Sequence, residues 1–401
     1  MCSNQEVDFS FDELFFSRTD PRGKISSGNV VFRRISGFSW GEMLGKPHNV
    51  IRHPDVPRAV FWLLWDRLKR GLPTGAYVKN RAKDGRFYWV YAIVTPIDGG
   101  YLSVRLKPGS ALFDIVEQEY AQLLAAEKAG DMTPAQGAEA LTVRLAELGF
   151  PSYDAFMGTT LIAEFVNRSE KCDTAMHPAV SLYSELMSAS TRLLEAAQAI
   201  VDGYQRYRFV PLNLTVQASR LGDQGRAICA ISHNYETLSE QIRLGLDDFL
   251  LAAQRVFQTI HEGAFLLATS EIQDEVASVF EREVTDAETD RVVEADHLKS
   301  QRLRFRADAM QKVVDVQWEV YVFSLNVSEI KRLAAGLAAI RIMGKVEVQR
   351  LEKGMLADLL MDLEAFQDLL RDGLGRILTV NEFVRAGASQ LSADAPVAVT
   401  G

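Results

Sequence analysis

Residues 75–107 read GAYVKNRAKDGRFYWVYAIVTPIDGGYLSVRLK, and this stretch decides the fold of the N-terminal part of the chain. Within it, residues 86–97 are dense in aromatic and β-branched side chains, which favour strands. Asp84-Gly85, just before this run, is a dipeptide that tight hairpin turns prefer. We therefore predict two long antiparallel strands, over 75–83 and 86–97.

A third strand and a helix complete this pattern. Gly99-Gly100 turns the chain into residues 101–107, where apolar residues alternate with polar ones, as expected of a half-buried strand. Upstream, residues 57–70 begin with a proline and end before a glycine, and their apolar side chains recur at helical spacing. Strands that follow such a helix predict a compact α+β domain.

The composition changes after residue 109. Ala, Leu, Glu and Arg dominate from there, and apolar residues recur every three or four positions, so we predict helices up to about residue 385. Long amphipathic helices pack as an antiparallel bundle or coiled coil, and we expect breaks near 203–211, 222–225 and 373–375. The predicted parts are the α+β domain (1–109), a small helical segment (110–166), a connector (167–178), a region of long helices (179–385) and a disordered tail (386–401).

The distribution of charge along the chain indicates which kinds of partner it can bind. The chain is 47% hydrophobic and 24% charged, which is ordinary for a globular protein. Residues 1–107 carry 17 Lys and Arg against 10 Asp and Glu, a net charge of +7, whereas the remaining residues carry 27 against 43, a net charge of −16. Nucleic-acid binding needs a clustered basic face, so this acidic helical region predicts no nucleic-acid partner.

Apolar runs and cysteines indicate the compartment. No apolar run reaches the roughly 18 residues that would span a bilayer, and the first ten residues lack the features of a signal peptide, so we expect a cytoplasmic protein. The three cysteines, Cys2, Cys172 and Cys229, are too few and too scattered for a disulfide framework or a thiolate metal site. We expect them to be reduced.

Residues 45–71, GKPHNVIRHPDVPRAVFWLLWDRLKRG, carry the most informative motif, and the VKNRAKDG stretch at 78–85 follows it. From about Phe15 to Lys107 the chain resembles the PAS domain of bacterial aerotaxis receptors. The resemblance implies an antiparallel sheet with short flanking helices. It also implies non-covalently bound FAD, whose redox state reports oxygen or electron-transport status. We therefore expect a redox sensor.

The resemblance implies a set of flavin-binding residues, and their chemistry suits a dinucleotide. An Arg-His pair can donate charge-assisted hydrogen bonds to a pyrophosphate, an acidic side chain can orient either base, and an amide can bond a flavin ring. Tryptophans, of which four of five fall in this domain, can form a flat apolar slot. The candidate residues are Asn29, Arg52, His53, Asp55 and Trp65, with Trp89 nearby.

Other interpretations of this domain stay open. The same polar residues could simply hold a loop, in which case the domain is a cofactor-free docking or adaptor module. Haem would need an axial ligand, for which the domain offers only His48 and His53. A blue-light flavin adduct needs a reactive cysteine, and no cysteine lies between residues 3 and 171.

A second motif lies at residues 211–241, PLNLTVQASRLGDQGRAICAISHNYETLSEQ. It resembles a degenerate form of the signalling hairpin of methyl-accepting chemotaxis proteins, although Gln217 stands where the family has glutamate and Pro211 interrupts the incoming helix. The resemblance implies a homodimer whose tip contacts a chemotaxis coupling protein and histidine kinase, or another signalling protein. The candidate tip residues are Asn213, Gln217, Arg220, Asp223 and Arg226.

The alternative for this motif is a plain helical turn with a bundle core. A similar pattern at 340–351 suggests an internal repeat. Ser232-His233 resembles a phosphoacceptor box, but no ATP-binding segment follows it, and the chain has no P-loop, zinc-ligand spacing, nucleotide-cyclase motif or nucleophile elbow. We therefore predict that the protein is not an enzyme.

Overall fold

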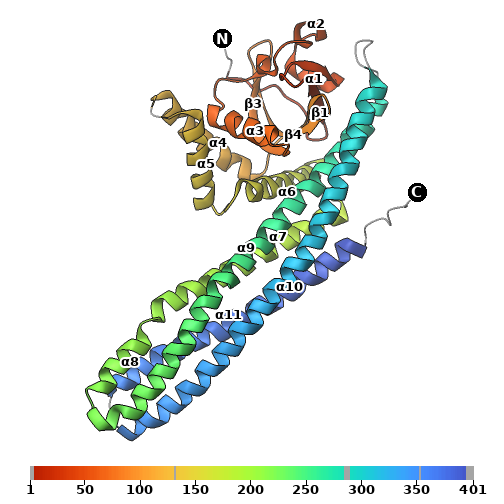
Figure 1. Ribbon diagram of the computed structural model, residues 1–401. Helices are drawn as coiled ribbons and strands as arrows, with labels where there is room; N and C mark the ends of the chain where they lie inside the picture. Colours follow the sequence, from red (N-terminus) through yellow and green to blue (C-terminus); the bar gives the residue numbers. More distant parts are fainter. Residues whose placement is uncertain (1–3, 131, 284–289, 352–353, 394–401) are drawn as a thin grey trace. The chain divides into compact units, whose positions relative to one another are not determined.

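The computed structural model describes residues 4–130, 132–283, 290–351 and 354–393 (Figure 1). The chain divides into two compact units. Unit 1 comprises residues 1–184 and 261–311, and unit 2 comprises residues 185–260 and 312–401. Three long helices contribute residues to both units.

A five-stranded antiparallel sheet forms the centre of unit 1, with the strand order β2-β1-β5-β4-β3. The predicted hairpin and third strand are confirmed: β3 and β4 pair in register, and Gly85, with a φ of +94°, lies in the turn between them. Gly100 is needed at the next turn, because a Cβ there would lie 1.9 Å from the carbonyl oxygen of Thr19. The strands are β1 (Phe15–Thr19), β2 (Ile25–Gly28), β3 (Thr74–Arg81), β4 (Phe87–Ile97) and β5 (Gly100–Leu106).

Short helices follow β2 and precede β3. Asn29 begins the first of them, because its side chain accepts a hydrogen bond from the Phe32 amide at 3.3 Å. The predicted helix over 57–70 is confirmed as α3. The helices here are α1 (Val30–Ser36), α2 (Trp40–Met43), the 3₁₀ helix η1 (His48–Ile51) and α3 (Arg58–Lys69). This is the expected α+β PAS fold.

Helices from three other parts of the chain complete unit 1. The helix α6 carries Glu164, whose buried carboxylate accepts hydrogen bonds from Tyr77 Oη at 2.7 Å and from Ser110 Oγ at 2.6 Å. This buried network joins β3 to the helical segment. Three helices lie wholly in unit 1, namely α4 (Ala111–Lys128), α5 (Pro134–Glu147) and α6 (Tyr153–Cys172). Unit 1 also contains the start of α7 (Pro178–Tyr207), residues 261–282 of α9 (Arg226–Arg282) and residues 291–311 of α10 (Arg291–Leu351).

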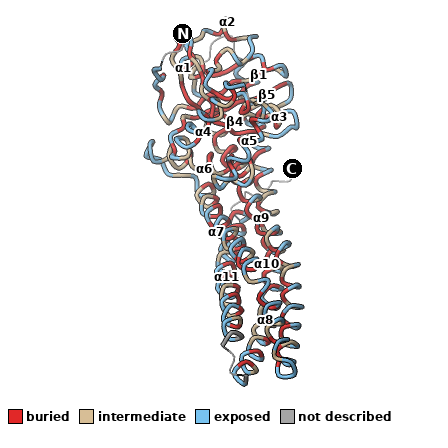
Figure 2. The backbone as a smooth tube through the Cα atoms, turned by 90° about the vertical axis from the view of Figure 1, so that its left-hand side faces the viewer, coloured by how far each residue is buried: buried red, intermediate tan, exposed pale blue. Residues whose placement is uncertain are grey.

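Unit 2 contains only helices among its described residues. Buried positions alternate with exposed ones at helical spacing along each helix (Figure 2), as expected of a bundle. Its elements are the remainder of α7, α9 and α10 together with α8 (Val210–Ser219), the 3₁₀ helix η2 (Gly222–Gly225) and α11 (Gly354–Ala393). The region of long helices that we predicted is therefore present.

Several predicted boundaries need correction. The break expected near 373–375 is absent, because α11 is continuous there and Gly373 packs against Ile200 of a neighbouring helix. The tail expected over 386–401 is helical up to Ala393, and residues 394–401 lie outside the described residues. The connector is shorter than the predicted 167–178, since α6 ends at Cys172 and α7 begins at Pro178.

Candidate functional site

A cavity of about 670 Å³ lies in the PAS domain, between the sheet and the segment that contains η1 and α3. Its volume is within the range of small-molecule sites. Apolar side chains from the sheet and α3 form much of its wall. Its apolar lining includes Phe61, Trp62, Leu64, Trp65, Leu68, Val78, Val94 and Tyr101. No cysteine lines it.

Basic side chains also line this cavity. Arg22, Arg58 and Lys69 are exposed, and Arg52 is partly buried with its guanidinium 3.8 Å from the ring centroid of Phe61. Asp66 is the acidic residue of the lining, and it already pairs with Arg70 at 3.1 Å. The lining therefore carries an excess of positive charge, which suits an anionic group such as a phosphate.

Deeper in the domain, three residues of the lining have unsatisfied polar atoms. Arg105 Nη1, Asn80 Nδ2 and Ser103 Oγ are buried and have no hydrogen-bond partner among the described residues. Buried polar atoms are normally paired, so unpaired ones call for an explanation. Three of them lie around one cavity, where a bound ligand could supply the missing partners.

Arg105 is the centre of this polar group. Its side chain is buried, and its Nη2 donates to Ser17 Oγ at 2.9 Å and to His48 Nε2 at 2.7 Å. Burial lowers its pKa from 12.5 to about 10. Among the described residues no carboxylate forms an ion pair with it, so the cation lacks a counter-ion. A buried charge of this kind is costly unless something negative faces it.

His48 is held in its neutral form. The residue is partly buried and lines the cavity, and burial, followed by the charge of Arg105, lowers the pKa of His48 from 6.5 to about 3. Because a guanidinium only donates, His48 Nε2 accepts and the ring proton lies on Nδ1. The Nε2 lone pair is therefore engaged, which disfavours His48 as an axial haem ligand in this conformation.

Two of the five candidate flavin residues line the cavity, namely Arg52 and Trp65. Trp65 packs edge-on against Tyr101, with ring centroids 5.2 Å apart. Trp89, which we expected nearby, instead packs against Phe113 and Tyr120 of α4. The reason is strand alternation, since neighbouring side chains of β4 face opposite sides of the sheet.

His53 and Asp55 lie outside the cavity lining. The buried His53 accepts a hydrogen bond at Nδ1 from the Asp55 amide at 3.2 Å, and its ring packs against Phe87. The Asp55 carboxylate lies 3.5 Å from Lys79 Nζ on β3. These contacts hold the loop that contains Arg52.

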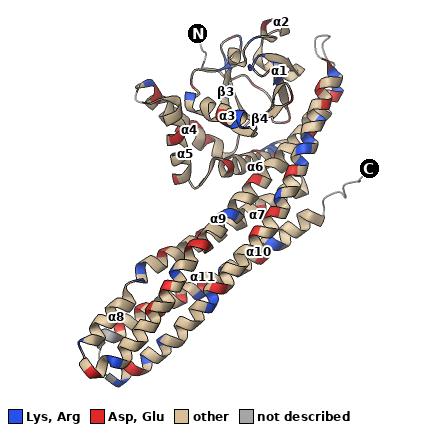
Figure 3. Cartoon of the chain, in the orientation of Figure 1, with Lys and Arg blue, Asp and Glu red and all other residues tan. Residues whose placement is uncertain are grey.

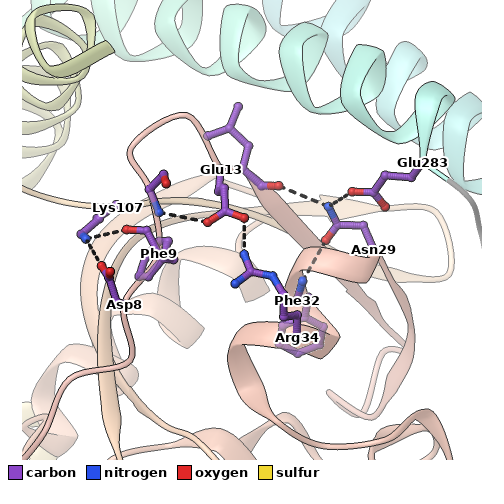
Figure 4. Close-up of polar contacts among 10 residues, drawn as sticks. Asp8, Phe9, Glu13, Asn29, Phe32, Arg34, Lys107 and Glu283 are labelled. Atoms are coloured by element: carbon purple, nitrogen blue, oxygen red, sulfur yellow. Dashed lines mark hydrogen bonds and ion pairs between the residues drawn. The ribbon is translucent and has the colours of Figure 1, made fainter.

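Asn29 also contacts protein groups and does not line the cavity. Besides capping α1, its Nδ2 donates to Leu14 O at 3.2 Å and to Glu283 Oε1 at 3.0 Å (Figure 4). Glu283 follows the last residue of α9, and its Oε2 accepts from the Val30 amide at 3.1 Å. A carboxylate at a helix N-terminus is favourable, so the end of α9 is attached to the start of α1.

The strand β1 lies between the cavity and these long helices. Ser17 contacts Arg105 and Thr19 lines the cavity, whereas Phe16 packs on Phe280 with ring centroids 5.0 Å apart. Arg18 forms an ion pair with the buried Glu294 of α10 at 2.8 Å. Because side chains alternate along a strand, β1 touches the polar group on one face and α9 and α10 on the other.

A second glutamate joins the helical segment to the cavity wall. Glu127, at the end of α4, accepts hydrogen bonds from the amides of Arg58 and Ala59 at 2.8 Å each. These are the first amides of α3, which lack partners within the helix. Both α1 and α3 are therefore capped by carboxylates from outside the PAS domain.

Sequence reasoning missed the polar residues of the sheet. We predicted β5 as half-buried with its polar residues facing solvent, but both of its faces are buried and Ser103 and Arg105 line the cavity. The signal available was an arginine in a short strand otherwise rich in apolar residues. Alternation alone does not reveal which face of a strand a second layer covers.

The predicted signalling tip forms a turn between α8 and α9. Gly225 is needed here, because a Cβ would lie 1.9 Å from Ala218 O. Arg220 and Asp223 are exposed. Asp223 pairs with Arg226 at 2.9 Å. Asn213 is also exposed, and Gln217 is partly buried.

Residues 340–351 belong to the last turns of α10. Gly344 there lies close to Ile231 of α9, so the possible repeat and the α8–α9 turn are near each other within unit 2. Acidic and basic residues are interspersed along the long helices, without a continuous basic stretch in this view (Figure 3). Within the described residues, no helix has a stretch long and apolar enough to cross a membrane.

The sheet and its short helices form a compact α+β domain that contains the cavity. Residues 27–104 match the family model described as the PAS fold. The N-terminal domain of this chain belongs to the PAS family.

Curated relatives extend this assignment. The chain is 37% identical to the Aerotaxis receptor of Escherichia coli (strain K12) over 126 residues, which are 30% of this chain and 25% of that protein. It is 33% identical to the Biofilm dispersion protein BdlA of Pseudomonas aeruginosa over 104 residues, 25% of each chain. The chain thus spans about a quarter of the length of these two relatives. The similarity supports a signal-transduction sensor, and the long helices fit a chemoreceptor-like signalling part.

Solved structures with a similar domain include the PAS domain of a protein from Colwellia psychrerythraea and the light state of the blue-light photoreceptor Aureochrome1 LOV. The first is 20% identical with a TM-score of 0.22 and covers 23% of this chain and 85% of that one. The second is 22% identical with a TM-score of 0.23 and covers 28% and 90%.

Proposed function

We propose that this protein is a cytoplasmic redox or oxygen sensor that binds FAD non-covalently in the PAS cavity and signals through its long helices. The observation that carries this proposal is the buried Arg105 at the cavity wall, whose Nη1 has no hydrogen-bond partner among the described residues, with unsatisfied atoms of Asn80 and Ser103 beside it. A cofactor-free docking domain gains nothing from such groups, because an apolar wall would be more stable.

The residues that line the cavity suit the chemical groups of FAD. Asn80, Ser103 and Arg105 can donate to the oxygen and nitrogen atoms along the polar edge of an isoalloxazine ring, while Trp65 and apolar wall residues can contact its flat surfaces. Arg52 and the exposed basic residues of the lining suit the pyrophosphate. Bound FAD would supply a ring that takes up and releases electrons at the potentials of cellular carriers.

The chain's own contacts provide a route from the cavity to the helices. A change in the charge that faces Arg105 alters its hydrogen bonds to Ser17 and His48. Ser17 lies on β1 between Phe16 and Arg18, which contact α9 and α10. A shift of β1 therefore changes the packing of these helices, as a two-state switch requires.

For the output, we propose a homodimer whose α8–α9 turn contacts a signalling partner of the kind that a chemotaxis coupling protein or histidine kinase represents. The exposed Arg220, Asp223 and Arg226 support this assignment. The protein acts by binding and conformational change, without a catalytic reaction of its own.

The visible absorption spectrum of the full-length protein, purified without added cofactor, tests the central proposal. We expect flavin bands that bleach on anaerobic reduction and return in air. A featureless spectrum that FAD addition leaves unchanged would support the docking module instead, and a Soret band would support haem.

Variants of the cavity test the site. Arg52→Ala and Trp65→Ala should lower flavin occupancy at least tenfold while the fold is retained, because each removes a side chain that lines the cavity. Arg86→Ala is a matched control, since this arginine, whose side chain is 42% exposed, lies on the β3–β4 turn outside the cavity lining and pairs with Asp84. Full occupancy in both cavity variants would remove the assignment.

A further inference from the structure

The helix α10 is apolar on two opposite faces within unit 2. One face is buried in the unit, and it includes Val313, Val320 and Phe323. On the other face, six large apolar side chains are each between 52% and 62% exposed. They are Val314, Trp318, Tyr321, Leu325, Ile342 and Val346. A surface helix normally carries polar residues on its solvent side, so this outward face requires a covering partner.

The spacing of this face identifies a helix as its partner. From Val314 to Val346 the exposed positions recur in steps of four and three residues without interruption. This is the heptad pattern with which two helices pack along a shared seam. The 33 residues span about 50 Å, since each residue of a helix rises about 1.5 Å. Such a long regular seam fits an equally long helix of the same period.

The distribution of large and small side chains identifies that helix as a second copy of α10 in the antiparallel direction. With a two-fold axis at position 330, Tyr321 lies opposite Ala339 and Leu325 lies opposite Ala335. Bulky residues of one helix then meet small residues of the other, as a self-complementary two-fold interface requires.

The outer layers fit the same pairing. Trp318 lies opposite Ile342 and Val314 lies opposite Val346, so both ends of the seam are apolar. At the centre Arg332 lies opposite Ser328, and its charge is already paired with Glu329 of the same helix at 2.6 Å. A parallel pair would instead place Arg332 against Arg332 and leave two alanine layers facing each other, with repulsion and poor filling.

The six large side chains supply most of the area of a specific interface. The six large side chains expose roughly 100 Å² each, on the order of 600 Å² per copy before flanking residues are counted. Specific interfaces bury about 800 Å² per partner. We propose that the outward face of α10, from Val314 to Val346, is the dimer interface of this protein and pairs antiparallel with the same face of a second copy. This proposal specifies the dimerisation proposed above and does not depend on flavin.

Sedimentation equilibrium of the full-length protein tests the surface. The unaltered chain should be a dimer, and the variant Trp318→Glu with Leu325→Glu should be a monomer, because both charges would be buried in the seam. Leu244→Glu and Met361→Glu are matched controls, since these residues are 58% and 60% exposed on α9 and α11. They should leave the dimer intact. Equal circular dichroism in all variants establishes that the helices persist.

Disulfide trapping tests the direction. In a background with serine at the three natural cysteine positions, a mixture of Leu325→Cys protein with Ala335→Cys protein should form a cross-linked heterodimer, while neither protein should cross-link alone. Cross-linking of each alone would overturn the antiparallel arrangement. If the variant Trp318→Glu with Leu325→Glu remained a dimer, the outward face of α10 would not be the dimer interface. If the unaltered chain were a monomer, the proposal of a homodimer would be wrong as well. The flavin spectrum, measured on the same samples, reports independently on the sensor proposal.

Discussion

Arg105→Met should separate the stability of the domain from its binding of a ligand. The substitution removes the buried cation and keeps a long apolar side chain in its place. A pKa lowered from 12.5 to about 10 means that the fold disfavours the charged form of Arg105 by about 3 kcal/mol relative to the unfolded chain. The hydrogen bonds from this charged group to Ser17 and His48 offset this cost, at about 1.5 kcal/mol each. The ligand-free variant should therefore match the parent in stability to within about 1 kcal/mol.

FAD binding should weaken although the stability of the domain is kept. A charged hydrogen bond to a ligand contributes about 1.5–3 kcal/mol, so its loss should weaken FAD binding by at least tenfold. Flavin fluorescence titration measures this affinity. Urea unfolding, followed by tryptophan fluorescence, measures stability, since four of the five tryptophans lie in the PAS domain. Arg86→Met, which removes an exposed charge, should change neither quantity.

One combination of results would refute this reasoning. If Arg105→Met destabilised the ligand-free domain by more than about 1 kcal/mol and left FAD affinity unchanged, Arg105 would be a structural residue whose charge the fold tolerates. The cavity would then need another explanation for its unsatisfied atoms.

Three further predictions concern the surroundings of the cavity and the tip. The pKa of His48 is lowered from 6.5 to about 3, so the contribution of His48 to the free energy of unfolding is complete above pH 6.5 and is lost as the pH falls. The loss is at most about 2.5 kcal/mol at pH 4.5. His48→Gln should remove this part of the acid sensitivity in urea unfolding. Glu283→Ala should speed hydrogen exchange at the Val30 amide by roughly tenfold, because its acceptor is lost. Arg220→Glu with Asp223→Arg should abolish partner capture while circular dichroism stays unchanged, because both side chains are exposed.

Each of these three predictions has a control or an outcome that would contradict it. Glu281→Ala, on an exposed glutamate that pairs with Lys299 near the end of α9, should leave exchange at Val30 unaltered. An unchanged acid sensitivity in the His48 variant would show that other groups govern it. If the tip variant unfolded, the turn would be part of the bundle core rather than a partner-binding surface.

Local patterns were enough to predict three strands, the helix before them, the helical character of the later residues and part of the site. Alternation and turn residues located β3, β4 and β5, and apolar spacing located α3, because these features depend on neighbouring residues. The motif around Arg52 indicated a flavin-type PAS domain, and Arg52 and Trp65 do line the cavity. The motif is informative because one short segment carries both the loop and the helix of the cavity wall.

The remaining features required contacts between distant residues. A sequence does not state which layer covers a strand, so the polar face of β5 was predicted to face solvent. For this reason Arg105 was not among the predicted site residues. Asn29 was assigned to the ligand, yet it meets Glu283, 254 positions away. The sequence around Asn29 and Glu283 contains no pattern that predicts this contact.

By itself, the sequence determined that a PAS domain precedes long helices, because periodicity, turn residues and a local motif are properties of neighbouring positions. Only the tertiary structure decided which polar residues surround the cavity, which carboxylates cap α1 and α3, and which apolar face of α10 stays outside the bundle. The physical reason is that α10 is apolar on opposite sides, so its sequence permits either face to be buried. Packing against α9 and α11 selects one face and leaves the other for a partner.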